Sequence, residues 1–111
     1  MAIEDRMYDF SVRIAEIVRY LKENESGFPL CDKLLDCVIG AGIFIRKNNY
    51  QEAADNLQQI SYILEMAVKS GYLTERQSLP ILSDCHELLT AVTDAINSTC
   101  DYTAANGGNG R

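Results

Sequence analysis

The sequence predicts an all-α protein, an antiparallel up-down-up-down bundle of four helices. Four segments repeat apolar residues at alternating spacings of three and four, which is the pattern of helices that pack nearly parallel to their neighbours. The connections between the segments are short, and short connections favour antiparallel neighbours. With 111 residues the chain is long enough for one core and too short for two. We predict a bundle over residues 1–98 and a flexible C-terminal tail over residues 99–111.

The first segment predicts an amphipathic helix that begins near Ile3 and ends near Glu23. Charged residues occupy its other faces, and its apolar seam consists of Ile3, Met7, Phe10, Ile14, Ile17 and Leu21. A loop, Asn24-Glu25-Ser26-Gly27, follows this helix. Pro29 comes next, and proline is well suited to the first position of a helix.

The second segment predicts a helix whose second half is apolar on nearly every side. Its seams start at Leu30 and Cys31. A helix that is apolar all round must be covered all round, which in so small a bundle implies burial by another subunit. We therefore predict an oligomer interface made of Val38, Ile39, Ala41, Gly42, Ile43, Phe44 and Ile45. A buried strand is the alternative, because these residues are rich in β-branched side chains. The helix is favoured, since its seam begins well before Val38 and no partner strand is evident.

The third segment predicts a helix that is capped by Asn49, with Glu52 three residues on. Its seam consists of Ala53, Leu57, Ile60, Leu64 and Ala67. Gly71 ends it, because glycine is the usual residue just past a helix end.

The fourth segment predicts a helix that begins at Thr74, with Gln77 completing a capping box. Its seam consists of Leu82, Cys85, Leu89, Val92 and Ile96. Pro80 lies beyond the first turn, so the helix is either kinked there or starts with Ser78 as its cap. The apolar pattern stops at about Thr99.

The charge balance argues against a simple polyanion-binding protein. Asp and Glu outnumber Lys and Arg by 16 to 10, and the formal net charge is −6. The longest uncharged apolar run, 38–45, is far below the roughly 20 residues that span a bilayer, so we expect no membrane partner. Glu4 and Asp5 stand where a signal peptide needs basic and apolar residues, and we predict a cytoplasmic protein.

The sequence offers no catalytic, cofactor or metal site, and we expect neither an enzyme nor a small-molecule substrate. The cysteines form no CxxC pair, and Cys31, Cys37 and Cys85 are interpreted as reduced core thiols, whereas Cys100 is expected to be exposed. The single histidine, His86, follows Cys85, and adjacent helical residues point about 100° apart, which discourages shared metal ligation.

Two pairs of basic residues are the candidates for phosphate contacts. Arg6 and Arg13 are seven residues apart on one face of the first helix, and Arg46 and Lys47 end the second helix. These residues form either ordinary solvated helix faces or a basic patch that an oligomer repeats.

Four short motifs resemble those of a family of bacterial four-helix-bundle proteins. The motifs are Tyr8-Asp9-Phe10, Gly27-Phe28-Pro29 before Leu34-Leu35, Ser70-Gly71-Tyr72-Leu73-Thr74, and Glu87-Leu88-Leu89. Over roughly Ile3 to Asn97 the chain is similar to proteins encoded in intervening sequences of ribosomal RNA genes. It is also similar to the related accessory variability determinant (Avd) proteins of diversity-generating retroelements. The ribosomal-insert proteins commonly have Asn-Ile-Ala-Glu-Gly where this chain has Phe44-Ile45-Arg46-Lys47-Asn48, a difference that favours the Avd branch.

The resemblance implies a homo-oligomer, typically a ring of five bundles, that associates with a reverse transcriptase and its RNA or DNA. Our functional hypothesis is therefore a non-enzymatic oligomeric adaptor. The alternative is a structural or regulatory protein-interaction bundle with no nucleic-acid role.

Overall fold

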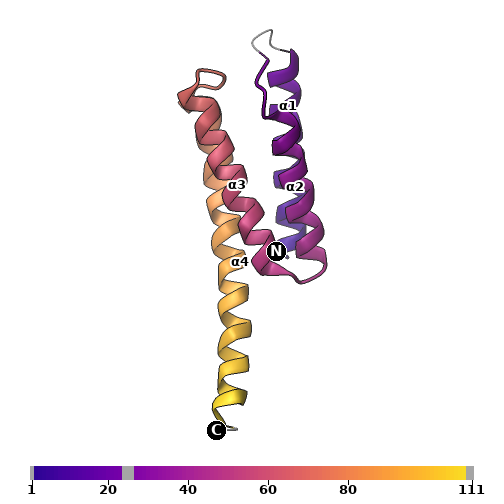
Figure 1. Cartoon of the computed structure of the whole chain (residues 1–111), viewed down its shortest axis with the longest axis vertical. Coiled ribbons are helices and arrows are strands. Elements are labelled where there is room, and N and C mark those ends of the chain that lie inside the picture. The colour runs from indigo at the N-terminus through magenta and orange to yellow at the C-terminus, as the bar shows by residue number, and fades with distance from the viewer. Residues whose placement is uncertain (1, 24–26, 110–111) are drawn as a thin grey trace.

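The computed structural model describes residues 2–23 and 27–109, with side chains described as far as Ser98. The described residues form four helices and no strand, so the predicted all-α bundle is confirmed. The helices are α1 (Ile3–Glu23), α2 (Cys31–Arg46), α3 (Tyr50–Lys69) and α4 (Glu75–Asn109). α1 packs against α2 and α4, and α3 packs against the same two helices. The α2–α3 and α3–α4 connections lie at opposite ends of the bundle (Figure 1).

The core is built largely from the predicted apolar seams. In α1, Met7, Phe10, Ile14 and Leu21 are buried, and α3 contributes Ala53, Leu57, Ile60, Leu64 and Ala67. From α4 the buried residues include Ile81, Cys85, Leu88 and Val92. The predicted seam is therefore right at Cys85 and Val92, whereas the predicted Leu82, Leu89 and Ile96 are only partly buried. Each helix therefore turns its apolar stripe inward, and burial of these stripes is the main source of stability in such a bundle.

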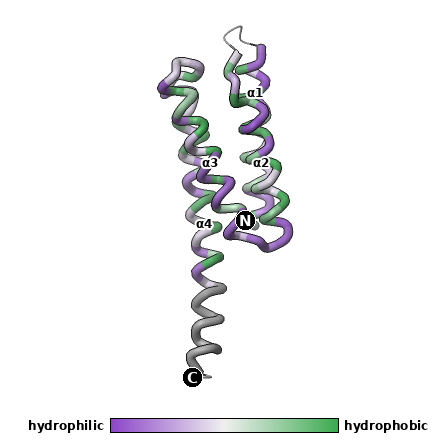
Figure 2. Tube along the Cα trace, viewed as in Figure 1, coloured by the Kyte–Doolittle hydropathy of each residue, from purple (hydrophilic) through white to green (hydrophobic). Residues whose placement is uncertain are grey.

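The apolar second half of α2 divides between the core and the surface. The strand alternative for this segment is wrong, because α2 is helical over its whole length, and its apolar stretch is visible in Figure 2. Val38, Ala41 and Ile45 are at most 2% exposed within the single chain. Their predicted place in a subunit interface is therefore corrected, since side chains that fill the core of one chain cannot contact a second. Ile39 and Ile43 are 56% and 45% exposed, and Gly42 and Phe44 are half-buried.

The predicted caps set the starts of α3 and α4. The Asn49 side chain accepts a hydrogen bond from the Glu52 N–H. At α4, the Gln77 N–H donates to Thr74 Oγ1 at 3.1 Å, and the Thr74 N–H donates to Gln77 Oε1 at 2.8 Å, which completes the capping box. The start at Ser78 is therefore wrong, and Pro80 lies inside α4.

The ends of the predicted segments differ from the structure at the start of α2 and at the end of α4. Pro29 lies before α2, which begins at Cys31 with Leu30 as its N-cap. The backbone of α4 remains helical to Asn109, past the point at Thr99 where the apolar pattern stops. Extension of a helix that has already formed avoids the cost of nucleation, so the added turns do not each need an apolar stripe. The side chains of 99–111, including Cys100, lie outside the described residues, and the flexibility of this tail stays a prediction. Residues 24–26 of the first predicted loop also lie outside them, while Gly71 has the positive φ (86°) expected after a helix end.

Candidate interaction surfaces

Four large apolar side chains are exposed together on α1 and α2, and we name them the α1–α2 patch. They are Tyr8 (65% exposed), Val12 (45%), Ile39 (56%) and Ile43 (45%). Tyr8 and Val12 are one turn apart on α1, as are Ile39 and Ile43 on α2, so each pair shares a helix face. Tyr8, Ile39 and Ile43 line one cavity between the two helices. An exposed apolar cluster of this kind is typical of a surface that another molecule covers.

Gly42 also lines this cavity. A Cβ built on Gly42 would lie 3.9 Å from Met7 Cγ, an ordinary van der Waals distance, so the approach of α1 and α2 does not require a glycine here. Two charged residues, Glu4 and Arg46, also line the cavity. The patch is therefore apolar in its centre and charged toward the end of α2.

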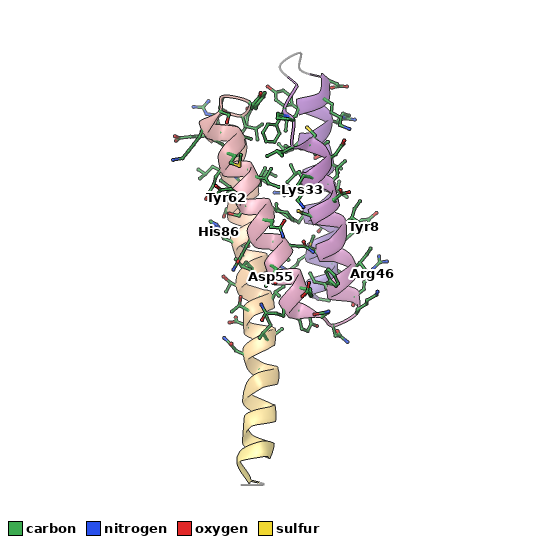
Figure 3. All side chains as sticks on the ribbon, viewed as in Figure 1. Tyr8, Lys33, Arg46, Asp55, Tyr62 and His86 are labelled. Atoms are coloured by element: carbon green, nitrogen blue, oxygen red, sulfur yellow. The ribbon has the colours of Figure 1, made fainter. Side chains whose placement is uncertain are left out.

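A second apolar surface lies on α3, and we name Tyr62 and Met66 the α3 patch. Tyr62 is 67% exposed and Met66 is 37% exposed. Both line a groove between α2 and α3, together with the apolar Leu30 and Ile63 and the polar Lys33, Asp55, Gln58 and Gln59. Figure 3 shows Tyr62 and Asp55 on α3.

The predicted phosphate-contacting residues do not form one site. Arg6 donates to Glu87 Oε1 at 3.5 Å, and Arg13 forms an ion pair with Asp84, so both arginines face carboxylates of α4. Arg46, the last residue of α2, instead lines the cavity of the α1–α2 patch. Lys47 is exposed next to Arg46. A guanidinium that is already paired with a carboxylate attracts a phosphate less strongly, so the arrangement favours Arg46 and Lys47 over Arg6 and Arg13.

The described cysteines are buried thiols, as predicted. Cys85 is 0% exposed, its Sγ donates to the Leu57 carbonyl at 3.3 Å, and burial raises its pKa to about 12. Burial likewise raises the pKa of Cys31 and of Cys37. Thiols held protonated in this way are poor nucleophiles at neutral pH.

The described residues contain neither a metal-binding cluster nor a membrane-spanning helix. His86 is exposed on α4, and nowhere in the described part of the chain do three His, Cys, Asp or Glu side chains gather as a metal site would require. No helix in that part is both long and apolar enough to cross a membrane.

The two patches contain residues that the predicted interface omits. Tyr8, Val12, Tyr62 and Met66 lie off the apolar seams of their helices, and an apolar residue off the seam is the signal that identifies them in the sequence. The pattern alone does not show which of these residues gather at one surface, because that depends on how the helices are placed side by side.

No known protein-family profile matches the chain, and no curated protein matches it. Among solved structures, the chain is similar to a protein of unknown function from the S23 ribosomal protein family of Bacteroides thetaiotaomicron. The TM-score is 0.80 and the sequence identity is 21%, over 86% of this chain and 98% of that chain. At this identity the similarity shows the fold alone. The chain is a small all-helical bundle with the fold of that protein, which fits a helical-bundle family without separating the ribosomal-insert branch from the Avd branch.

Proposed function

We propose that this protein is a non-enzymatic adaptor that self-associates through the α1–α2 patch. The observation that carries the proposal is the exposure of Tyr8, Val12, Ile39 and Ile43 on two adjacent helices. Covering exposed apolar side chains is favourable because it removes apolar surface from water. In this proposal the subunit is an antiparallel up-down-up-down bundle, and five copies form a cytoplasmic ring, as the sequence resemblance implies.

The partner in this proposal is a reverse transcriptase with its RNA or DNA, in a diversity-generating retroelement. Lys47 supplies the phosphate contact, because it is exposed and belongs to no ion pair among the described residues. The net charge of −6 also suits the basic surface of a protein partner.

The second candidate is a structural or regulatory protein-interaction bundle without a nucleic-acid role. The specific observation in its favour is the pairing of Arg6 with Glu87 and of Arg13 with Asp84. This pairing removes half of the predicted phosphate contacts and leaves the α1–α2 patch unchanged.

Size-exclusion chromatography with light scattering and ultraviolet absorbance, on the untagged full chain, tests both candidates. A mass that is a multiple of the subunit mass supports self-association, and co-eluting nucleic acid supports the reverse-transcriptase setting. An oligomer free of nucleic acid supports the second candidate. A monomer at micromolar concentration rejects self-association.

A pair of charge-reversal variants tests the phosphate contacts. Lys47→Glu is expected to reduce the amount of bound RNA severalfold, because a phosphate contact becomes a repulsion. Lys69→Glu is the matched control, since Lys69 is also an exposed lysine at the end of a helix. Equal RNA binding by the two variants would reject Lys47 as a contact.

A further inference from the structure

We infer that the α1–α2 patch of one copy packs against the α3 patch of the next copy, in a head-to-tail contact. This inference rests on the proposed self-association and names the two surfaces that meet. Both patches consist of large apolar side chains that are exposed in the single chain. Because they lie on different helices, one contact between two copies covers one patch of each and leaves the other patch of each ready for a further copy.

The charged residues beside the two patches have opposite signs and lie at the same distance from their patches along the helix. Arg46 follows Ile39 by seven residues, and Asp55 precedes Tyr62 by seven residues. Seven helical residues rise roughly 10 Å, so the distance along the helix from charge to apolar residue is the same on both surfaces. Arg46 and Asp55 also lie toward the same end of the bundle (Figure 3). When Ile39 of one copy meets Tyr62 of the next, Arg46 therefore meets Asp55.

Both charges are available for such a contact. Arg46 and Asp55 are exposed, and neither takes part in an ion pair within the described part of the chain. Opposite charges at the edge of an apolar contact fix its register and exclude other alignments.

A two-fold contact of the α1–α2 patch with itself is the rival arrangement. In that arrangement Arg46 approaches Asp36 of the other copy, but Tyr62 and Met66 remain in water. The head-to-tail contact covers all the residues of both patches. The two patches lie on helices that pack against each other, since α2 contacts α3. A head-to-tail contact forms a ring when its rotation closes, and the ring is part of the proposed function on which this inference rests.

Two variants that each block one surface test the contact. Ile39→Glu/Ile43→Glu blocks the α1–α2 patch, and Tyr62→Glu/Met66→Glu blocks the α3 patch. All four side chains are at least 37% exposed, so the folds should be retained, which circular dichroism checks. Tyr20→Glu/Leu79→Glu is the matched control, because Tyr20 (42%) and Leu79 (68%) are exposed apolar residues outside both patches.

The head-to-tail contact predicts that each blocked variant is a monomer by light scattering, whereas the control keeps the wild-type mass. An equimolar mixture of the two blocked variants should form a 1:1 dimer that grows no further, because one intact surface remains on each. If Tyr62→Glu/Met66→Glu keeps the wild-type mass, or the mixture forms no dimer, the inference is overturned while self-association stands. If the wild type itself is a monomer, the proposed function fails with it.

A charge exchange tests the register. Arg46→Glu should raise the concentration needed for half-assembly by roughly tenfold, and Arg46→Glu/Asp55→Arg should restore it, because the pair is then reversed but intact. A double variant that assembles no better than Arg46→Glu would overturn the pairing of these two residues.

Discussion

Two isoleucines that are two positions apart on α2 should respond very differently to truncation. Ile45 is 1% exposed and Ile43 is 45% exposed, although the sequence pattern assigns both to a subunit interface. Ile45→Ala and Ile43→Ala remove the same atoms from the same helix, so the comparison isolates the effect of burial.

The expected magnitudes follow from the exposed fractions. Truncation of Ile45 removes three buried carbon groups, worth about 0.8 kcal/mol each, and leaves a cavity, so the free energy of unfolding should fall by about 3–4 kcal/mol. Truncation of Ile43 loses only about half of the transfer term and opens no cavity, and alanine is a better helix former than isoleucine. Its cost to the single chain should be below about 1 kcal/mol.

Urea unfolding followed by circular dichroism at several protein concentrations is the assay. Ile45→Ala should lower the midpoint at every concentration, by the same free energy. Ile43→Ala should lower it mainly at high concentration, where the wild type gains stability from association. Equal losses in dilute solution would refute the assignment of Ile45 to the core and of Ile43 to the surface.

Four further predictions concern the α1–α4 contact, the buried thiol of Cys85 and the start of α4. A double-mutant cycle on Arg13 and Asp84 should give a coupling of about 0.2–1 kcal/mol that weakens in high salt, because the side chains are 53% and 34% exposed; a coupling above about 2 kcal/mol would contradict this reasoning. In a Cys100→Ser background, a thiol reagent should label Cys85 only as fast as the protein unfolds, and labelling of the native state at its free-thiol rate would show that Cys85 is accessible. The raised pKa of Cys85 means that the folded state keeps its proton between pH 9.0 and about 12 while the unfolded state loses it, so stability should fall as the pH rises through this window; a free energy of unfolding that stays constant there would contradict it. Thr74→Ala should cost about 1 kcal/mol in urea unfolding because the Gln77 N–H loses its partner, whereas Thr93→Ala, on an exposed face of the same helix, should cost less than about 0.5 kcal/mol; equal costs would argue against the cap.

Local sequence information predicts the helices well because their causes are local. The seam from Met7 to Leu21 follows from the helical repeat, and the starts of α3 and α4 follow from side chains three residues from their partners. The end of α4 is harder to predict from the sequence. The apolar pattern stops at about Thr99, but the helix continues to Asn109.

The candidate surfaces depend on contacts between residues that are distant in the sequence. α2 is apolar on nearly every side, so its own pattern leaves open whether Val38 or Ile39 faces the core. The packing of the four helices buries Val38 and exposes Ile39, and it brings α3 so close to Gly40 that a Cβ there would lie 2.8 Å from Asn56 Nδ2. In the same way, the pattern of α1 alone predicts that Arg6 and Arg13 form an unpaired basic face. In the structure α4 places Glu87 and Asp84 beside them, although these residues are more than seventy positions away in the sequence.

The number of helices, the caps that start α3 and α4, and most of the core can thus be predicted from local patterns, because hydrophobic periodicity and capping act within a few residues. Local patterns do not show which apolar side chains stay in water or which cations are already paired. Those two properties depend on how the helices rotate and pack against one another, and that arrangement is set by all four helices together.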